Sequence, residues 1–441
     1  MSVLRNCCVM IAAALLATAC TEKLGSGRAC PGLCPIEEVF ISDTTIQGVV
    51  VDSTVFSGPA VGSEGRLLLA TRTDSALDLR AVIRFDSLPN TFTITKNGAS
   101  VTDTIKGLLK AQLLVVGDSV TSDLLPKSDS IVIAAYDVDT TGVADTAVAP
   151  VAALFVPSRK LGEGRFRSAL AADTMRIPLN DSIVAARMIG NGRLRIGLRL
   201  ESGGNTLIRL SSTTGAHEPV LQYRAFSGAD TTAADTLRAW FANSSSPTDD
   251  QTVKRQLADY TLVVKGTPAP PPGVFAVGGI RGRRTYLAFD VPKRLLDSTQ
   301  IVRATLRLSQ IPAPLAQPGD TARLEALLGT AKGVVKDVAK RTLFHEPLTF
   351  NASGQVVGAI SGLPEVRLKA DTTAIRSIEV APIMRAWVNV DSTDVPHTII
   401  LQLPTEGTEL TELWFASLEA APALRPSLQI TFVPRNAPGI P

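Results

Sequence analysis

The stretch LRAVIRFDSLP, residues 79–89, decides the fold because the chain repeats it: residues 284–292 read RTYLAFDVP. Both stretches show the partial alternation of a half-buried strand, and both end in Phe-Asp before a proline-containing turn. The pattern predicts that the phenylalanines point into a core and that the aspartates accept backbone N–H groups in the turns. Calcium binding is the alternative role for the carboxylates. The four residues are Phe85, Asp86, Phe289 and Asp290.

Three further landmarks recur in the same order, each separated from its counterpart by about 200 residues, which indicates two copies of one module. The matching stretches are residues 111–113 with 304–306, 196–200 with 399–403, and 219–221 with 426–428. Between the copies, the small and polar stretch FSGADTTAADT, residues 226–236, has the composition of a linker.

The composition favours strands over helices. Short apolar runs rich in valine, isoleucine, leucine and threonine alternate with Asp-Thr, Asp-Ser and Gly pairs, and aromatic residues make up only 5% of the chain. Such runs and breaks are typical of strands joined by turns. Helical spacing is clearest in residues 329–341 and 378–390. The sequence therefore predicts an all-β fold with a few short helices.

The repeated motifs resemble DNRLRE-type modules, which are related to disaggregatase repeats and to a carbohydrate-binding module family. Such modules carry a strand that begins with Arg and ends in Phe-Asp, an Ala-x-Leu strand, a short helical segment ending near a Trp, and a closing Ser…Pro-x-Leu strand. The resemblance implies two tandem jelly-roll-like β-sandwich domains with a carbohydrate-binding-like role. The matching positions are residues 80–86, Ser212 and Pro219 in the first copy, and residues 284–290, Trp387, Ser417 and Pro426 in the second.

These observations together predict the domain boundaries. Module 1 spans residues 37–226, the linker 227–236, module 2 237–434, and a short tail 435–441.

The first twenty residues, MSVLRNCCVMIAAALLATAC, have the pattern of an export signal. One arginine precedes an apolar run that is too short to remain as a membrane span, and small residues precede Cys20. This resembles the lipobox of bacterial lipoproteins. It predicts a signal peptide over residues 1–19, lipidation of Cys20, and an anchor and tether over residues 20–36. A plain cleaved signal is the alternative.

Lipidation of Cys20 would fix the protein to a membrane, because several acyl chains together give stable anchoring. By resemblance to lipoprotein sorting, Thr21 after the cysteine favours the bacterial outer membrane, on either face.

Two cysteines remain in the tether. Cys30 and Cys34 stand in CPGLC, and exported compartments are oxidising, so we expect a disulfide that closes a tight turn. A redox-active pair is the alternative, although no thioredoxin-like βαβ pattern surrounds it.

The charge pattern excludes one class of partner. The net charge is only +3, and no basic block with interleaved aromatic residues occurs, which argues against nucleic-acid binding. The expected partners are a membrane, through the lipid, and either polysaccharide or other envelope proteins.

One stretch suggests an enzyme. In LLVVGDSVT, residues 113–121, a strand followed by Gly-Asp-Ser resembles the nucleophile block of SGNH-type esterases, in which Ser119 would use His397 as a base oriented by Asp394. The alternating strand–helix pattern and the Gly-x-Asn-Asp block of those enzymes are missing. A turn is the favoured interpretation, and the chain is predicted not to be an enzyme.

Metal and sugar sites have weaker signals. Asp137, Asp139 and Asp145 have a loose loop spacing without an EF-hand pattern, so solvated loops are favoured over a calcium site. Trp387 lies in a short amphipathic stretch, where a core position is favoured over a sugar-stacking platform. No cofactor is expected.

The sequence as a whole predicts an exported lipoprotein with a non-catalytic binding or structural module, for which polysaccharide is the ligand that the resemblance implies. Two alternatives remain: an envelope structural or assembly lipoprotein that contacts other proteins, and the SGNH-type esterase.

Overall fold

The structure is a computed structural model. It describes residues 41–47, 51–56, 61–62, 64–72, 77–96, 98–117, 130–139, 147–167, 173–201, 206–227, 237–244, 257–316, 319–328, 365–388 and 397–435. Among these residues, no helix combines the length and apolar character that a membrane crossing requires. The cysteines at 20, 30 and 34, Ser119, Asp145 and Asp394 lie outside the described residues.

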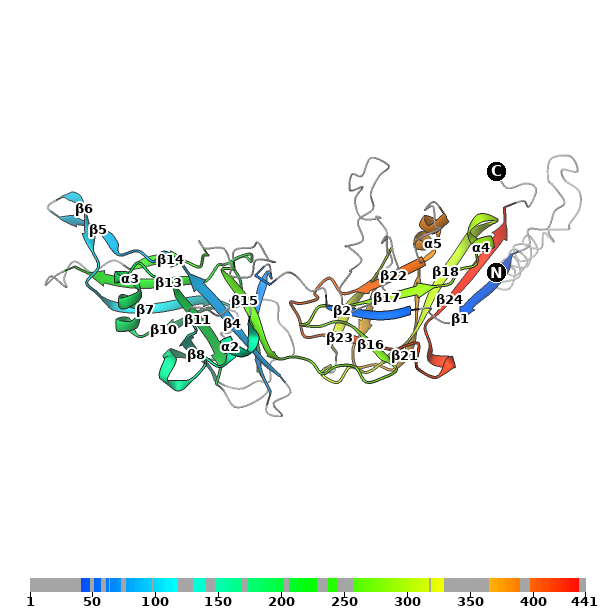
Figure 1. The fold of residues 1–441 in the computed structure, drawn as a ribbon, viewed down its shortest axis with the longest axis horizontal. Coiled ribbons are helices and arrows are strands. Elements are labelled where there is room, and N and C mark those ends of the chain that lie inside the picture. Colours follow the sequence, from blue (N-terminus) through cyan, green and yellow to red (C-terminus); the bar gives the residue numbers. More distant parts are fainter. Residues whose placement is uncertain are drawn as a thin grey trace, which may run out of the picture.

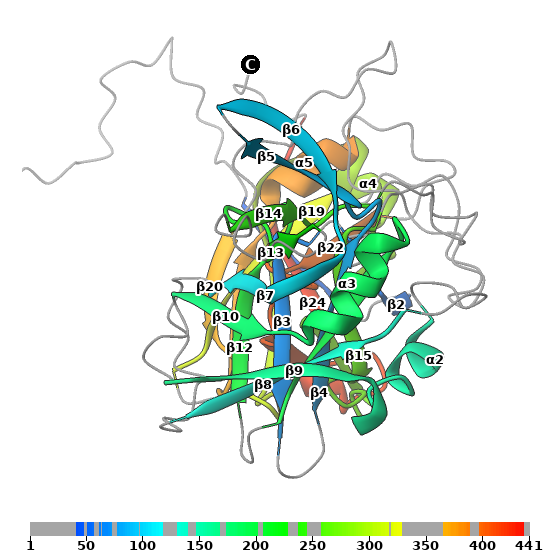
Figure 2. The same cartoon turned by 90° about the vertical axis from the view of Figure 1, so that its left-hand side faces the viewer.

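Two sheets form a first sandwich, called sandwich 1 (Figure 1). The larger sheet runs in the order β12 (Thr206–Ser211), β3 (Arg66–Thr71), β4 (Asp78–Phe85), β11 (Leu194–Leu200), β8 (Ile131–Asp137) and β9 (Lys160–Phe166), with β15 (Asp259–Lys265) also paired to β4. The smaller sheet runs in the order β10 (Thr174–Pro178), β7 (Gly107–Val116), β13 (Val220–Phe226) and β14 (Arg238–Phe241). A hairpin of β5 (Thr91–Lys96) and β6 (Ala99–Thr104) projects beyond both sheets (Figure 2).

One large sheet forms the second sandwich, called sandwich 2. Its order is β1 (Ser42–Gln47), β24 (Ser427–Pro434), β18 (Thr299–Ile311), β23 (Glu412–Ala416), β16 (Val274–Gly278), β17 (Arg283–Phe289), β22 (His397–Gln402), β19 (Thr321–Leu328) and β20 (Glu365–Lys369). In addition, β2 (Val51–Phe56) pairs with β17, and β21 (Ala374–Glu379) pairs with β18. A single hydrophobic core takes residues from both halves of the sheet, so the halves face each other as two layers.

Only short helices accompany these strands. They are α2 (Val148–Ala152), α3 (Asp181–Ile189), α4 (Lys293–Asp297) and α5 (Ala381–Val388), with 3-10 turns at Pro157–Arg159 and Pro422–Leu424. α3 begins after Asn180, whose side chain accepts the backbone N–H of Ile183 at 3.1 Å as an N-cap. α5 lies inside the predicted helical stretch 378–390, whereas residues 329–341 lie outside the described part. The predicted all-β sandwich fold is confirmed.

The first copy of the opening motif is buried on both faces of β4. Ala81, Ile83 and Phe85 enter the core between the two sheets. On the other face, Val82 packs in a second cluster with Phe155, next to α2. β4 is therefore covered on both sides, and its two arginines, Arg80 and Arg84, are buried beside Asp78 and Asp86.

The strand registers of the two sandwiches repeat. Ile196 of β11 is the partner of Ile83 in β4, and in sandwich 2 Ile399 of β22 is the partner of Leu287 in β17. On the opposite layer, β13 is paired with β7 through Leu221 and Leu113, and β24 with β18 through Leu428 and Leu306. The landmarks found in the sequence therefore occupy equivalent positions in two copies of one fold.

The two copies exchange their first two strands. In sequence, β1 and β2 precede the first copy of the Phe-Asp strand, yet they pair with β24 and β17 of sandwich 2. In the same way, β14 and β15 precede the second copy and pair with β13 and β4 of sandwich 1. The exchange is reciprocal in detail: Asp259 of β15 is the partner of Ile83, and Asp52 of β2 is the partner of Leu287.

This pairing groups the chain differently from the predicted modules 37–226 and 237–434. Those ranges coincide with the two sequence repeats, but sandwich 1 consists of β3 to β15 and sandwich 2 of β1, β2 and β16 to β24. The predicted linker, 227–236, joins two strands of one sandwich. The chain passes from one sandwich to the other between β2 and β3, and again between β15 and β16 at residues 266–273.

The sandwiches lie end to end along the longest axis of the molecule (Figure 1). Ile280, in the β16–β17 turn, packs with Leu68, Leu79 and Leu207 on the outer face of sandwich 1. Beside this patch, Glu409 of sandwich 2 approaches Arg66 at 3.4 Å. The two halves thus share a small apolar contact with a polar border.

Candidate functional site

A cleft lies at the junction of the two sandwiches and has a volume of about 620 Å³. Small and polar residues line it, with Gly117, Ser211 and His217 from sandwich 1 and Thr405 and Thr408 from sandwich 2. A cleft of this size falls in the range that accommodates small ligands, and junctions between domains are common places for such sites. No motif in the sequence pointed to it, because its residues come from segments far apart in the chain.

The cleft is held by bonds on both sides. On the sandwich 1 side, the Ser211 hydroxyl accepts the backbone N–H of His217 at 2.9 Å, which positions an exposed imidazole at the rim. On the sandwich 2 side, Thr408 donates to the carbonyl of Thr405 at 2.9 Å. Arg66 also lines the cleft, and its contact with Glu409 spans the junction. Among the residues that line it are hydroxyl groups, the Arg66 guanidinium and the His217 imidazole, but no Phe, Tyr or Trp ring.

The phenylalanines of the repeated motif are both in the cores, with Phe85 at 0% and Phe289 at 2% exposure. Asp86 is buried beside Arg84, whose Nε donates to its carboxylate at 2.7 Å. Its own backbone N–H donates to the Asn243 side chain at 3.0 Å. Asp290, by contrast, is exposed at the end of β17. Asp86 therefore has a guanidinium neighbour that the turn prediction did not include.

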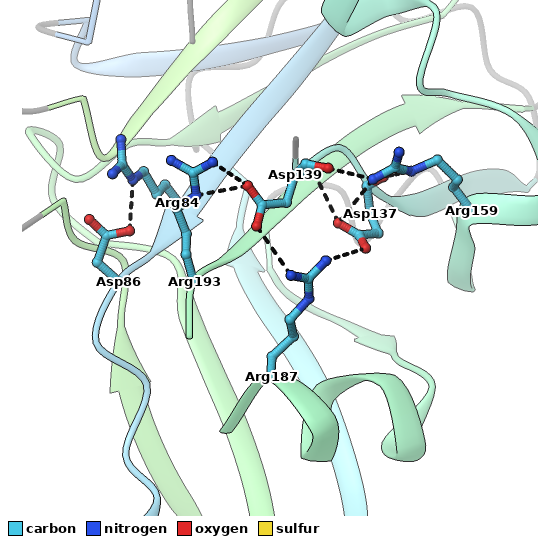
Figure 3. Close-up of polar contacts among 7 residues, drawn as sticks. All are labelled: Arg84, Asp86, Asp137, Asp139, Arg159, Arg187 and Arg193. Atoms are coloured by element: carbon cyan, nitrogen blue, oxygen red, sulfur yellow. Dashed lines mark hydrogen bonds and ion pairs between the residues drawn. The ribbon is translucent and has the colours of Figure 1, made fainter. Parts of the chain in front are cut away.

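Asp137 and Asp139, two of the candidate calcium ligands, are held by three arginines at the end of β8 (Figure 3). Arg187 donates to the Asp137 carboxylate at 2.9 Å and approaches Asp139 at 3.4 Å. Arg193 donates to Asp139 at 2.7 Å, and Arg159 donates to the carbonyl of Asp137 at 2.6 Å. Three cations that already surround two carboxylates disfavour a further divalent cation at these two residues.

Trp387 is buried in α5, with its ring centroid 5.2 Å from that of His397. Neither Trp387 Nε1 nor His397 Nε2 has a hydrogen-bond partner among the described residues. Burial lowers the pKa of His397, and the negative charge of Asp290 opposes that shift. His397 of the esterase hypothesis thus sits in sandwich 2, whereas Ser119 follows β7 of sandwich 1 in sequence and lies outside the described residues.

Two of the buried carboxylates that were not anticipated from the sequence stand out, Asp259 in the exchanged strand β15 and Glu412 beside the second crossing segment. Asp259 of β15 accepts the backbone N–H of Thr213 at 2.7 Å and its hydroxyl at 2.8 Å. Burial raises the pKa of Asp259 to about 6, although both bonds oppose the shift. Glu412 of β23 faces Arg283 of β17 at 2.7 Å, and both side chains are only 3% exposed.

The Arg283–Glu412 pair also binds the second crossing segment. Arg283 donates to the carbonyl of Pro268 at 3.1 Å, and Thr267 donates to Glu412. Trp414 completes the site by donating its indole N–H to Glu412 at 2.9 Å. Burial raises the pKa of Glu412, and the positive charge of Arg283 works against this shift. These groups are satisfied by one another, which is typical of a structural network.

Comparisons with known proteins add no family. No family model matches the chain, and no curated protein matches it. Among solved structures, the Macrobrachium rosenbergii nodavirus is similar at 9% identity over 94% of this chain and 98% of that chain, with a TM-score of 0.15. The infectious bursal disease virus Gx strain is similar at 9% identity over 92% of this chain and 78% of that chain, with a TM-score of 0.11.

Proposed function

We propose that this chain is an exported bacterial lipoprotein, anchored in the outer membrane through Cys20, whose two sandwiches form a non-catalytic module that binds polysaccharide. The observation that carries the ligand proposal is the cleft at the junction, to which both sandwiches contribute. Its hydroxyl groups and the Arg66 and His217 side chains suit a polymer rich in hydroxyl and carboxylate groups. The resemblance to DNRLRE-type modules and the lipobox-like N-terminus support the same proposal.

The test is binding by the chain made without its lipid cysteine. We expect affinity electrophoresis against a panel of polysaccharides, including uronic-acid polymers, to show retardation by at least one polymer. Thr408→Trp should abolish the retardation, because the indole fills the cleft. Thr102→Trp on the exposed strand β6 is the matched control and should leave it unchanged. Retardation that survives Thr408→Trp would place the ligand elsewhere, and no retardation by any polymer would reject polysaccharide binding.

A second candidate is an envelope structural or assembly lipoprotein. It is favoured by the burial of the aromatic side chains. Of the large apolar side chains that are exposed in the described part of the chain, only Phe241 is aromatic. A sugar-stacking face needs several exposed rings. If no polysaccharide binds, chemical cross-linking in intact cells should instead join the chain to envelope proteins.

A further inference from the structure

The strand pair β1–β2 docks on sandwich 2 through a complete set of contacts. Every residue of β1 has a partner in β24, and every residue of β2 has one in β17. Side chains add to the ladder: the Thr54 and Thr285 hydroxyls lie 3.1 Å apart, and Thr431 donates to Asp43 at 2.6 Å. The docking site therefore consists of two strand edges, one on β24 and one on β17. Neither edge belongs to the first repeat, from which β1 and β2 come.

The equivalent site on sandwich 1 accepts β14–β15 in the same registers. Leu221 of β13 has Trp240 of β14 as its partner, and the equivalent Leu428 of β24 has Ile46 of β1. Each strand pair thus already occupies a core that its own repeat does not provide. A strand pair therefore docks wherever suitable strand edges are available, whether or not those edges belong to the sandwich that comes next along the chain.

The two strand pairs differ in how they are attached. β14–β15 is held at both ends, by the segment after β13 and by the crossing segment that Arg283 and Glu412 bind at Thr267 and Pro268. Within the described residues, β1–β2 is followed by the segment at Glu64 that leads into β3 of sandwich 1. That segment is bound to sandwich 1 at Glu64, whose carbonyl accepts the Thr214 hydroxyl at 2.7 Å.

We propose that copies of this chain assemble by exchanging β1–β2, so that the strand pair of one copy occupies the site on sandwich 2 of a second copy. Reciprocal exchange gives a closed two-fold dimer in which every strand pairing of the single chain is kept. The cost is the loss of translational and rotational freedom on association, so the dimer fraction rises with concentration. This inference does not depend on the ligand of the cleft.

Single cysteines test the exchange. Thr45 and Gln429 are directly opposed and exposed in the β1–β24 pair, within the reach of a disulfide. Two differently tagged chains, one carrying Thr45→Cys and the other Gln429→Cys, are co-expressed with all five native cysteines (Cys7, Cys8, Cys20, Cys30 and Cys34) replaced by serine. We expect a disulfide-linked heterodimer of about twice the chain mass, by non-reducing electrophoresis and light scattering. A third chain that carries both substitutions should close an internal disulfide when dilute.

The matched control places the cysteines in the strand pair that is held at both ends. Ala239 and Gln222 are opposed in the β14–β13 pair, and Ala239→Cys with Gln222→Cys on separate chains should give no heterodimer. A heterodimer from the Thr45 and Gln429 chains above this control supports the proposal. If the chain with both substitutions closes internally but the separate chains never link, exchange is confined to one chain and the proposal fails. If neither the internal nor the intermolecular disulfide forms, β1 does not pair with β24, and the proposal fails for that reason.

Discussion

At the scale of single residues, two buried carboxylates matter most: Asp259 in an exchanged strand and Glu412 beside the second crossing segment. Asp259 is the clearest, because it is 1% exposed and has no cationic partner among the causes of its pKa shift. In an unfolded chain the pKa of an aspartate is about 3.9. In the folded chain, burial raises the pKa of Asp259 to about 6. Between these values the folded state binds more protons than the unfolded state, so this group makes stability fall as the pH rises.

Asp259→Asn should therefore remove a pH-dependent loss of stability. The raised pKa of Asp259 corresponds to about 3 kcal/mol in the free energy of unfolding. The parent protein loses this stability as the pH rises from about 4 to about 6, and above pH 6 the loss is complete. We expect the parent and the variant to have similar urea midpoints near pH 4.5, and the variant to be the more stable near pH 7.5, because an amide oxygen still accepts from Thr213 without carrying a buried charge. A constant difference between the two midpoints across this range would contradict the assignment.

The Arg283–Glu412 pair gives a second prediction at this scale. Glu412→Gln leaves a guanidinium buried beside a neutral amide, which typically costs about 3 to 5 kcal/mol. Replacing both residues, Arg283→Met with Glu412→Leu, should cost less than Glu412→Gln alone, because no buried charge remains. Denaturant titrations of the three chains measure the difference, and a double variant less stable than Glu412→Gln would show that the bonds to Pro268 and Thr267 matter more than the charge.

At the scale of elements, the exchange of strand pairs predicts that removing β1 and β2 weakens sandwich 2. The order of the sequence alone would instead predict an effect on sandwich 1. A chain that begins at residue 61 lacks β1 and β2 and therefore exposes the edges of β24 and β17 in sandwich 2. Hydrogen exchange should then speed up in those two strands, whereas β4 and β13 of sandwich 1 keep their protection, since β14 and β15 still cover them. The control is the chain from residue 37. Faster exchange in β4 and β13 instead would mean that β1–β2 belongs to sandwich 1.

The elements also show how far the sequence could lead. The strand class, the two copies and their shared landmarks followed from local patterns, because alternation and motif order are written in consecutive residues. The partner of each strand was not predictable in this way. The edges of β13 and β24 offer equivalent backbone hydrogen-bonding groups and an equivalent leucine. A strand with an apolar residue such as Trp240 or Ile46 at the matching position therefore fits either edge. The cleft was missed for a related reason, since His217 and Thr408 meet only after the chain crosses between the sandwiches.

At the scale of the whole molecule, the junction decides whether the two sandwiches act as one body. Two crossing segments link them, and the apolar contact is small, with Ile280 at 6% exposure against the outer face of sandwich 1. Each sandwich has its own core, so loosening this contact should change their mutual orientation without unfolding either. The cleft, in contrast, needs both sides in place.

Ile280→Ser tests this division. We expect small-angle X-ray scattering to show a larger radius of gyration and a broader distribution of distances, because the crossing segments remain while the apolar contact is lost. The thermal stability of the two cores should change little, and any retardation by a polysaccharide that depends on the cleft should weaken. Val302→Ser, at a side chain 48% exposed on β18, is the matched control and should alter none of these. Scattering curves that superimpose for Ile280→Ser and the parent would mean that the crossing segments alone fix the orientation of the two sandwiches.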